Sequence, residues 1–313
     1  MRVIVTGCAG FIGSSLAHRL LQDGIDVVGI DCFLEESYSV RAKRQALSRL
    51  HGKSGFEFFP VDIREPLPNE AWDGVTVVVN LAAMPGLSKS WVDFDTYNEC
   101  NFIGVHQLLE QARQRNIEHF VQASTSSVYG QLATGAESDS LDPVSPYGVT
   151  KLAGERLVAA YGNSYQLPYS ILRYFSVYGP WQRPDMAFHI ISERILSSET
   201  VTVFGDGNQS RSNTFVDDAV AATTLALKIG PTGVAMNIAG GQEVTLLHAI
   251  NELEIALGKS ARIEFETARR GDQVRTSGDI NLAKETLGYE PSVLPSDGLA
   301  AQAEWHLQKR LLH

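Results

Sequence analysis

The sequence predicts an α/β fold in which helices cover both faces of a doubly wound parallel sheet, with a smaller C-terminal lobe added to it. Strand-like apolar runs alternate with helical patterns over roughly the first 178 residues, which is the order of repeated βα units. Continuous apolar runs, such as the three valines at 77–79, are typical of strands that are buried on both faces. Beyond Gly179 the expected elements become shorter, which indicates a second architecture.

The expected elements follow in order along the chain. For the sheet we expect strands at 2–6, 26–31, 56–63, 75–83, 119–124 and 169–174, with helices at 12–21, 97–114 and 147–162. The later part contributes strands at 201–204, 234–239 and 263–266, and helices near 186–198, 216–227, 245–257 and 296–309. We expect the lobe to cover the carboxyl ends of the strands, where doubly wound folds bind their ligands.

Composition excludes several classes of function. A chain of 313 residues with 44% apolar content can bury a large core. Its net charge of -10 argues against nucleic acid or an anionic membrane as the main partner, because both require a basic surface. There is no apolar run of ~18 residues, and the strand pattern begins at once, so we expect a cytoplasmic protein. Cys8, Cys32 and Cys100 lack metal-ligand spacing, and we expect neither a disulfide framework nor a metal.

A glycine loop between the first strand and the first helix predicts a dinucleotide site. Gly7, Gly10 and Gly13 leave the backbone N–H groups at a helix N-terminus open to a pyrophosphate, and Phe11 and Ile12 lie in the same loop. The spacing also occurs in plain tight turns, because glycine serves both purposes. The next strand provides a second observation that favours a dinucleotide site.

That strand ends in Asp31, whose carboxylate can accept hydrogen bonds from ribose hydroxyls and repel a 2′-phosphate. This favours NAD over NADP. Asp62 and Ile63 end the third strand, where they can flank an adenine, although an Asp in this position is equally common as a turn residue.

Tyr147 and Lys151 predict acid–base chemistry on the nicotinamide side. Residues four positions apart share one face of a helix, so an ammonium lies beside a phenol whose ordinary pKa is about 10. A neighbouring positive charge lowers that pKa. A tyrosine base beside a nicotinamide indicates oxidation of an alcohol by hydride removal.

These segments resemble the extended short-chain dehydrogenase/reductase superfamily, in the branch that acts on nucleotide sugars. The resemblance is carried by the glycine loop, Asp31, Asp62-Ile63, Asn80-Leu-Ala-Ala83, Asn101, the run 123–130, Tyr147, Lys151, the run 172–180 and Phe204-Gly-Asp-Gly207. It implies a Rossmann domain at 1–178 with a returning segment at about 212–241, and a nucleotide-sugar lobe at 179–211 and 242–313. It also implies that Leu81, Ala82, Ala83 and Asn101 contact NAD, and that Thr125 hydrogen-bonds the reacting hydroxyl.

The same resemblance narrows the reaction. Dehydratases of this superfamily place Asp-Glu where this chain has Ser126-Ser127, and the decarboxylases that make UDP-xylose carry Glu at the position of Ser127. Without those carboxylates, the only obvious further reaction of a 4-keto sugar is the return of the hydride. The sequence therefore predicts an isomerase, in which the keto sugar turns over and takes the hydride back on its other face.

Among the epimerases the sequence is most similar to UDP-glucuronate 4-epimerases, through Asp31-Cys-Phe, Met84-Pro-Gly and Pro180-Trp-Gln-Arg-Pro-Asp-Met-Ala-Phe-His189. Arg183 offers a planar fork for a C6 carboxylate, and serine hydroxyls can add hydrogen bonds. The resemblance implies these substrate contacts: Pro85, Thr125, Ser126, Ser127, Ser176, Arg183, Phe204, Arg211, Arg269 (with Arg270 as the alternative) and Asp272.

Two other interpretations stay open at this stage. The substrate could be UDP-glucose or UDP-N-acetylglucosamine, in which case Arg183 serves the fold or another hydroxyl. The chain could also be a non-catalytic scaffold that senses NAD. Relatives are commonly homodimers through two helices, here the segments 97–114 and 147–162, so a homodimer is expected.

Overall fold

The computed structural model describes residues 1–268 and 275–311, and its centre is a parallel sheet of seven strands. The strand order is β12-β7-β5-β4-β1-β2-β3, so the chain adds β2 and β3 on one side of β1 and then β4 and the later strands on the other side. The strands are β1 (Arg2–Thr6), β2 (Asp26–Ile30), β3 (Phe56–Phe59), β4 (Val77–Asn80), β5 (His119–Thr125), β7 (Tyr169–Tyr174) and β12 (Val234–Ile238). This is the predicted doubly wound fold, and its ligand position is the switch point at the carboxyl ends of β1 and β4.

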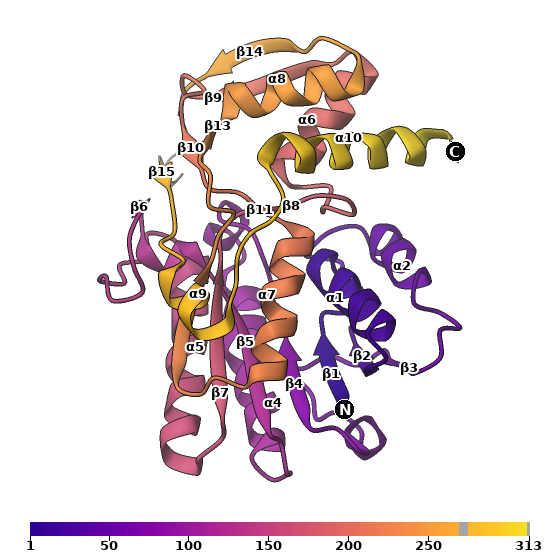
Figure 1. Ribbon diagram of the computed structural model, residues 1–313, viewed down its shortest axis with the longest axis vertical. Helices are drawn as coiled ribbons and strands as arrows, with labels where there is room; N and C mark the ends of the chain where they lie inside the picture. The colour runs from indigo at the N-terminus through magenta and orange to yellow at the C-terminus, as the bar shows by residue number, and fades with distance from the viewer. Residues whose placement is uncertain (269–274, 312–313) are drawn as a thin grey trace.

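Helices cover both faces of this sheet because neighbouring strand residues point to opposite sides. Val3 and Val5 of β1 belong to one core with α1 (Phe11–Gln22) and α7 (Val216–Ile229). Ile4, between them, belongs to a second core with α4 (Gly104–Ala112) and α5 (Pro146–Tyr165). Figure 1 shows α1 and α7 in front of the strands.

The C-terminal lobe lies beyond the carboxyl ends of the strands, at the top of Figure 1. Its framework is a parallel pair, β9 (Thr200–Phe204) with β14 (Arg262–Glu266), and three helices: α6 (Ala187–Ser197), α8 (Leu246–Leu257) and α10 (Pro295–Leu311). Short strands join the lobe to the sheet domain: β6 (Leu132–Ala133), β8 (Val177–Tyr178), β10 (Ser210–Arg211), β11 (Thr214–Phe215), β13 (Val244–Thr245) and β15 (Arg275–Thr276).

One carboxylate anchors α10 to α6. Glu193 accepts from His306 Nδ1 at 2.8 Å and from Arg310 Nη2 at 2.9 Å.

Among the helices of the described residues, none combines the length and the apolar composition that crossing a membrane requires.

The elements differ from the prediction in three ways. The expected helix at 97–114 is broken into α3 (Phe94–Asn98), a π-helical turn (Glu99–Ile103) and α4. Two helices were not predicted, α2 (Val40–Ser48) and α9 (Asn281–Leu287), because α2 is strongly charged and α9 is only seven residues long. The third and fourth strands are shorter than expected. The run 56–63 leaves the sheet after Phe59, where Pro60 interrupts it.

Candidate active site

The glycine loop has the geometry that a pyrophosphate requires. Gly10 is the N-cap of α1, so no side chain covers that helix end. Gly7 has φ +66°, and a Cβ there would lie 2.9 Å from Ala82 N. A Cβ on Gly13 would lie 2.1 Å from Gly7 O, so only glycine allows the loop to close on the helix. The three glycines thus shape one backbone cradle.

Asp31 lies at the end of β2 beside this cradle. Its carboxylate accepts from Ala9 N at 3.0 Å and from Phe33 N at 2.8 Å, and each oxygen keeps a lone pair for a ribose hydroxyl. Burial raises the pKa of Asp31 despite these bonds. Asp62 both turns the chain, by accepting from Arg64 N at 2.9 Å, and faces the same cavity.

These residues line one cavity of about 380 Å³ over the carboxyl ends of the strands. It brings together almost all of the predicted cofactor and reaction residues. The predicted residues in its lining are Gly7, Gly10, Phe11, Ile12, Gly13, Asp31, Asp62, Ile63, Leu81, Ala82, Ala83, Pro85, Thr125, Ser126, Ser127, Tyr147, Lys151, Ser176, Arg183 and Arg211. A pyrophosphate cradle followed by a ribose acceptor and apolar walls fits a dinucleotide such as NAD.

Thr125 and Tyr147 meet where β5 ends and α5 begins. Thr125 is the last residue of β5, and its Oγ1 accepts from Ser127 N at 3.1 Å. Tyr147 lies in the first turn of α5, whose N-cap Ser145 accepts from Gly148 N at 3.1 Å. A Cβ on Gly148 would lie 2.7 Å from Ser127 O, so this glycine permits the approach of the helix to the strand end.

Lys151 follows one helical turn later and is 5% exposed. Its Nζ donates to Ala123 O at 2.7 Å, which ties α5 to β5. Burial lowers the pKa of Lys151 to about 8, although Glu155 acts in the opposite direction. The ammonium therefore remains mostly charged at neutral pH.

The pKa of Tyr147 does not follow the simple expectation of a phenol made acidic by Lys151. Burial raises the pKa, while the hydrogen bond with Thr125 and the charge of Arg183 lower it. Desolvation is the largest of these effects, and the groups that oppose it are the threonine and the arginine. The sequence argument was wrong in direction because spacing shows which charges are near and does not show how much water the fold removes.

A buried polar chain connects the glycine-loop strand to this centre, and sequence reasoning missed most of it. Thr6 Oγ1 donates to Asn80 Oδ1 at 2.6 Å, and Asn80 Nδ2 donates to Gln122 Oε1 at 2.9 Å. Gln122 then donates to Ala123 O, the acceptor of Lys151. The available signal was a polar residue at the end of β1 and of β4, and another within the buried strand β5.

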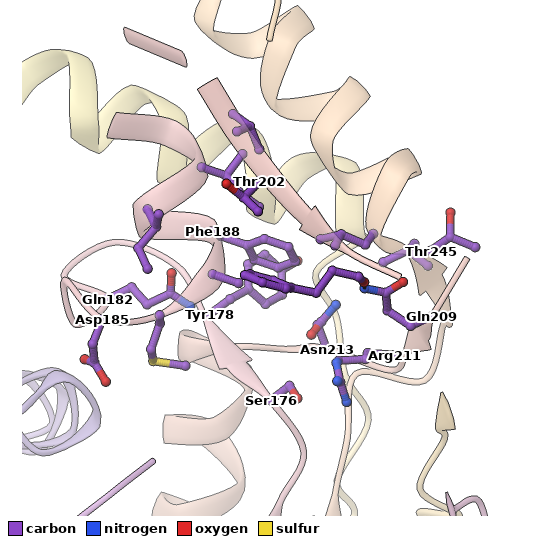
Figure 2. A pocket seen from close by; sticks show the side chains of 18 of the residues that line it. Ser176, Tyr178, Gln182, Asp185, Phe188, Thr202, Gln209, Arg211, Asn213 and Thr245 are labelled. Atoms are coloured by element: carbon purple, nitrogen blue, oxygen red, sulfur yellow. The ribbon is translucent and has the colours of Figure 1, made fainter. Parts of the chain in front are cut away.

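A second cavity, of about 400 Å³, adjoins the first, and Ser176, Val177, Met186 and Arg211 line both. Figure 2 shows Gln209, Arg211 and Asn213 at one end of it, and Gln182 and Asp185 at the other. Phe204, one of the predicted substrate contacts, belongs to this lining. Arg269, Arg270 and Asp272 lie outside the described residues.

The comparisons with known proteins agree with this geometry. The sequence model described as "NAD dependent epimerase/dehydratase family" matches residues 3–239. The chain belongs to this family. Relatives extend the likeness over its whole length. An uncharacterized UDP-glucose epimerase, YtcB, of Bacillus subtilis is 40% identical over 96% of each chain, and a UDP-glucuronate 4-epimerase of Thermodesulfobacterium geofontis is 36% identical over 96% of this chain and 95% of the relative.

The solved structures include a UDP-glucuronic acid 4-epimerase of Bacillus cereus, crystallised with UDP-glucuronic acid and NAD. It is 41% identical, covers 99% of this chain and 100% of that chain, and superposes with a TM-score of 0.94. The predicted superfamily, Rossmann-like fold, NAD cofactor and epimerase class are thereby confirmed.

One predicted cofactor contact, Asn101, lies outside the cavity lining and stays a prediction. Asn101 is 1% exposed and is not part of the cavity lining. Its amide holds Met84, accepting from N at 2.7 Å and donating to O at 3.0 Å, and also donates to Thr150 Oγ1. In this member of the epimerase family Asn101 therefore fixes the segment before Pro85 to helix α5.

Lys43 and Tyr38 are among the lining residues of the first cavity that were not predicted as site residues. Lys43, buried on α2, donates to Leu34 O at 2.6 Å, and its Nζ lies 4.9 Å from the centre of the Tyr38 ring. Burial lowers the pKa of Lys43, while Asp31 raises it. The signal in the sequence was weak, since α2 itself was not expected.

A cluster that the sequence did not suggest lies in the lobe. His189, Glu193 and His306 bring one possible metal-ligand atom each within 4.8 Å of one another. Glu193 is already paired with His306 and Arg310, and His189 Nδ1 lies 2.8 Å from Gln182 O. These bonds account for the cluster as the contact between α6 and α10.

Proposed function

We propose that this protein is a UDP-sugar 4-epimerase that interconverts UDP-glucuronate and UDP-galacturonate. The observation that carries the proposal is the wall around Tyr147. There, Ser126, Ser127 and Ser176 line the cavity together with Arg183, so hydroxyls and a guanidinium stand where a C6 carboxylate needs donors. The B. cereus relative, crystallised with UDP-glucuronic acid, supports the same choice.

Bound NAD supplies a reversible hydride acceptor for C4. Tyr147 removes the proton from the C4 hydroxyl as that hydride leaves, and Thr125 orients the hydroxyl. The resulting 4-keto sugar turns within the pocket, so that C4 takes back the hydride on its opposite face while Tyr147 returns the proton. The reaction is then a net isomerisation with no redox change.

The intermediate of this reaction is a β-keto acid, which loses CO₂ if its carboxylate bond aligns with the ketone. We propose that Arg183 and the serines restrain that rotation. Arg183→Ala should release a 4-keto pentose, with NADH remaining on the enzyme, whereas Arg115→Ala, in the turn before β5 at the amino ends of the strands, should not. If Arg183→Ala forms the normal epimer ratio without keto pentose, the restraint does not come from Arg183.

UDP-glucose is the second candidate substrate, and two observations favour it. Arg183 is already paired with Asp185, and one relative is described as a UDP-glucose epimerase. The test is to incubate the NAD-loaded protein with UDP-glucuronate, UDP-glucose or UDP-N-acetylglucosamine, and to resolve the C4 isomers by NMR. We expect conversion of the uronate to exceed that of both neutral sugars. Equal or faster conversion of a neutral sugar would refute the choice of UDP-glucuronate, and no conversion of any would support the scaffold interpretation.

We also propose a homodimer through the helices α4 and α5. Ile103 before α4 is 39% exposed, and Val149 and Tyr165 of α5 are 48% and 54% exposed. Apolar side chains on two adjacent helices are typical of a self-complementary interface. Sedimentation should give a dimer for the native chain and a monomer for Val149→Glu, and a native monomer would exclude this interface.

A further inference from the structure

The turn that carries Arg183 is held in place by buried amides. Gln182, 3% exposed, accepts at Oε1 from His189 N at 2.9 Å and from Gln302 Nε2 at 2.7 Å. The turn then closes through Met186 N, which donates to Arg183 O at 3.1 Å. Because α6 and α10 both fix Gln182, the backbone of this turn is preformed.

Within this turn Arg183 and Asp185 form a two-pronged ion pair. Arg183 Nε donates to Asp185 Oδ1 at 3.0 Å, and Nη2 donates to Oδ2 at 2.9 Å. The Arg183 side chain is 18% exposed and that of Asp185 is 44% exposed. Burial raises the pKa of Asp185, but the hydrogen bonds and charge of Arg183 outweigh this effect and lower it, so the carboxylate is ionised at neutral pH.

This pairing changes what the cavity presents to a ligand. A guanidinium has five N–H donors, and Asp185 takes two of them, so Arg183 keeps three for other partners. Asp185 changes the electrostatic attraction of the site more than it changes the number of free donors. An anion beside Arg183 experiences the positive charge of Arg183 and also the negative charge of Asp185. Asp185 lies in the lining of the second cavity, at the end shown on the left of Figure 2.

We propose that Asp185 is a specificity-determining residue, which sets how strongly the site prefers a sugar with a carboxylate at C6 over one with a neutral hydroxymethyl group. It does so by offsetting the charge of Arg183, so the native site tolerates a neutral hexose more than an unpaired arginine would. The inference rests on the proposed uronate substrate. It adds that the preference for the uronate is held below its maximum by a residue of the same turn.

Asp185→Asn is the direct test, because the amide keeps the shape of the side chain and one acceptor for Arg183. Calorimetry on the NAD-loaded protein would measure the Kd of UDP-glucuronate and of UDP-glucose. We expect the preference for the uronate, taken as the ratio of the two Kd values, to rise about tenfold, and the gain to shrink with added salt. An unchanged or smaller ratio would overturn the proposal. Asp73→Asn, an exposed carboxylate before β4 at the amino ends of the strands, away from the cavity, is the matched control and should leave the ratio unchanged.

A second pair of variants covers the case in which Asp185→Asn alone does not fold. In Arg183→Gln the carboxylate of Asp185 is left without its partner and repels a uronate, and adding Asp185→Asn removes this repulsion. The double variant must therefore show a higher uronate preference than Arg183→Gln, and equal ratios would refute the proposal. Each variant is measured in a Tyr147→Phe background, so that binding is recorded with little turnover. A native enzyme that epimerises only neutral sugars would then sink the proposed function and leave this test intact.

Discussion

The two walls of the site are built in different ways. The first wall, where we propose that C4 reacts, is buried: Thr125, Lys151 and Glu155 are at most 8% exposed, and their polar atoms bond within the fold. The second wall, where we propose that C6 is held, consists of Arg183 and Asp185, which lie on a turn and remain in part exposed. On this proposal the chemistry depends on the interior of the sheet domain, while selectivity depends on side chains that can be exchanged without disturbing it.

A buried ion pair lies next to these groups and holds the first wall together. Arg173 Nε and Nη2 donate to the two oxygens of Glu155 at 3.0 and 2.8 Å, and Arg173 Nη1 donates to Tyr129 OH at 2.8 Å. Ser124, next to Thr125, also donates to Glu155. The strand end that carries Thr125 is thereby tied to α5, which carries Tyr147.

The largest expected effect is on the first wall. Tyr147→Phe should lower kcat about 10³-fold, since it removes the acid–base group and keeps the ring, which packs 6.2 Å from the ring of Tyr97. Steady-state kinetics with UDP-glucuronate measures the loss. Tyr165→Phe, at the exposed end of the same helix, should retain full activity. A Tyr147→Phe enzyme with undiminished kcat would remove the basis for the mechanism.

The next effect concerns stability. Glu155→Gln leaves the Arg173 guanidinium buried with a neutral partner, and loss of one member of a buried pair costs about 3–5 kcal/mol. Urea unfolding should show this decrease in the free energy of unfolding. For the half-exposed pair Arg2–Glu57 the substitution Glu57→Gln should cost less than about 1 kcal/mol. Equal costs for the two substitutions would contradict the contrast between interior and surface.

Acid should weaken the lobe through His189. Burial lowers its pKa to about 4, against 6.5 in the unfolded chain. The unfolded state therefore binds more protons between these pH values, and the free energy of unfolding falls as pH drops from about 6.5 to about 4, by up to about 3 kcal/mol from this residue. Unfolding curves of His189→Gln should show a shallower fall over that range. An unchanged slope would mean that His189 is not held neutral. His119 of β5, whose pKa burial also lowers to about 4, adds a similar fall in both proteins.

The sequence predicted the first wall better than the second, for a physical reason. Tyr147 and Lys151 are one helical turn apart, and Gly7, Gly10 and Gly13 are held by a single loop, so local spacing determines their geometry. Arg183 and Asp185 are also close in sequence. Their spacing, however, does not show whether Arg183 binds the carboxylate of Asp185 or that of a substrate. The contact of Gln182 with Gln302 joins residues 120 positions apart and was not predictable. The predicted direction of the Tyr147 pKa shift was wrong for a related reason, since desolvation depends on the packing of the whole cavity.

The smallest expected effect tests the outer part of the second wall. Phe204 ends β9 and lines the second cavity, where a stacked base would lose contact area in Phe204→Leu. We expect the KM for the UDP-sugar to rise about fivefold, or about 1 kcal/mol, with kcat unchanged, because a contact to the nucleotide is the same before and during reaction at C4. Phe265→Leu on the adjoining strand β14 is the matched control, since Phe265 is 58% exposed and lies outside the cavity lining. A fall in kcat at constant KM would place Phe204 with the reacting groups, and the two walls would then not divide chemistry from recognition.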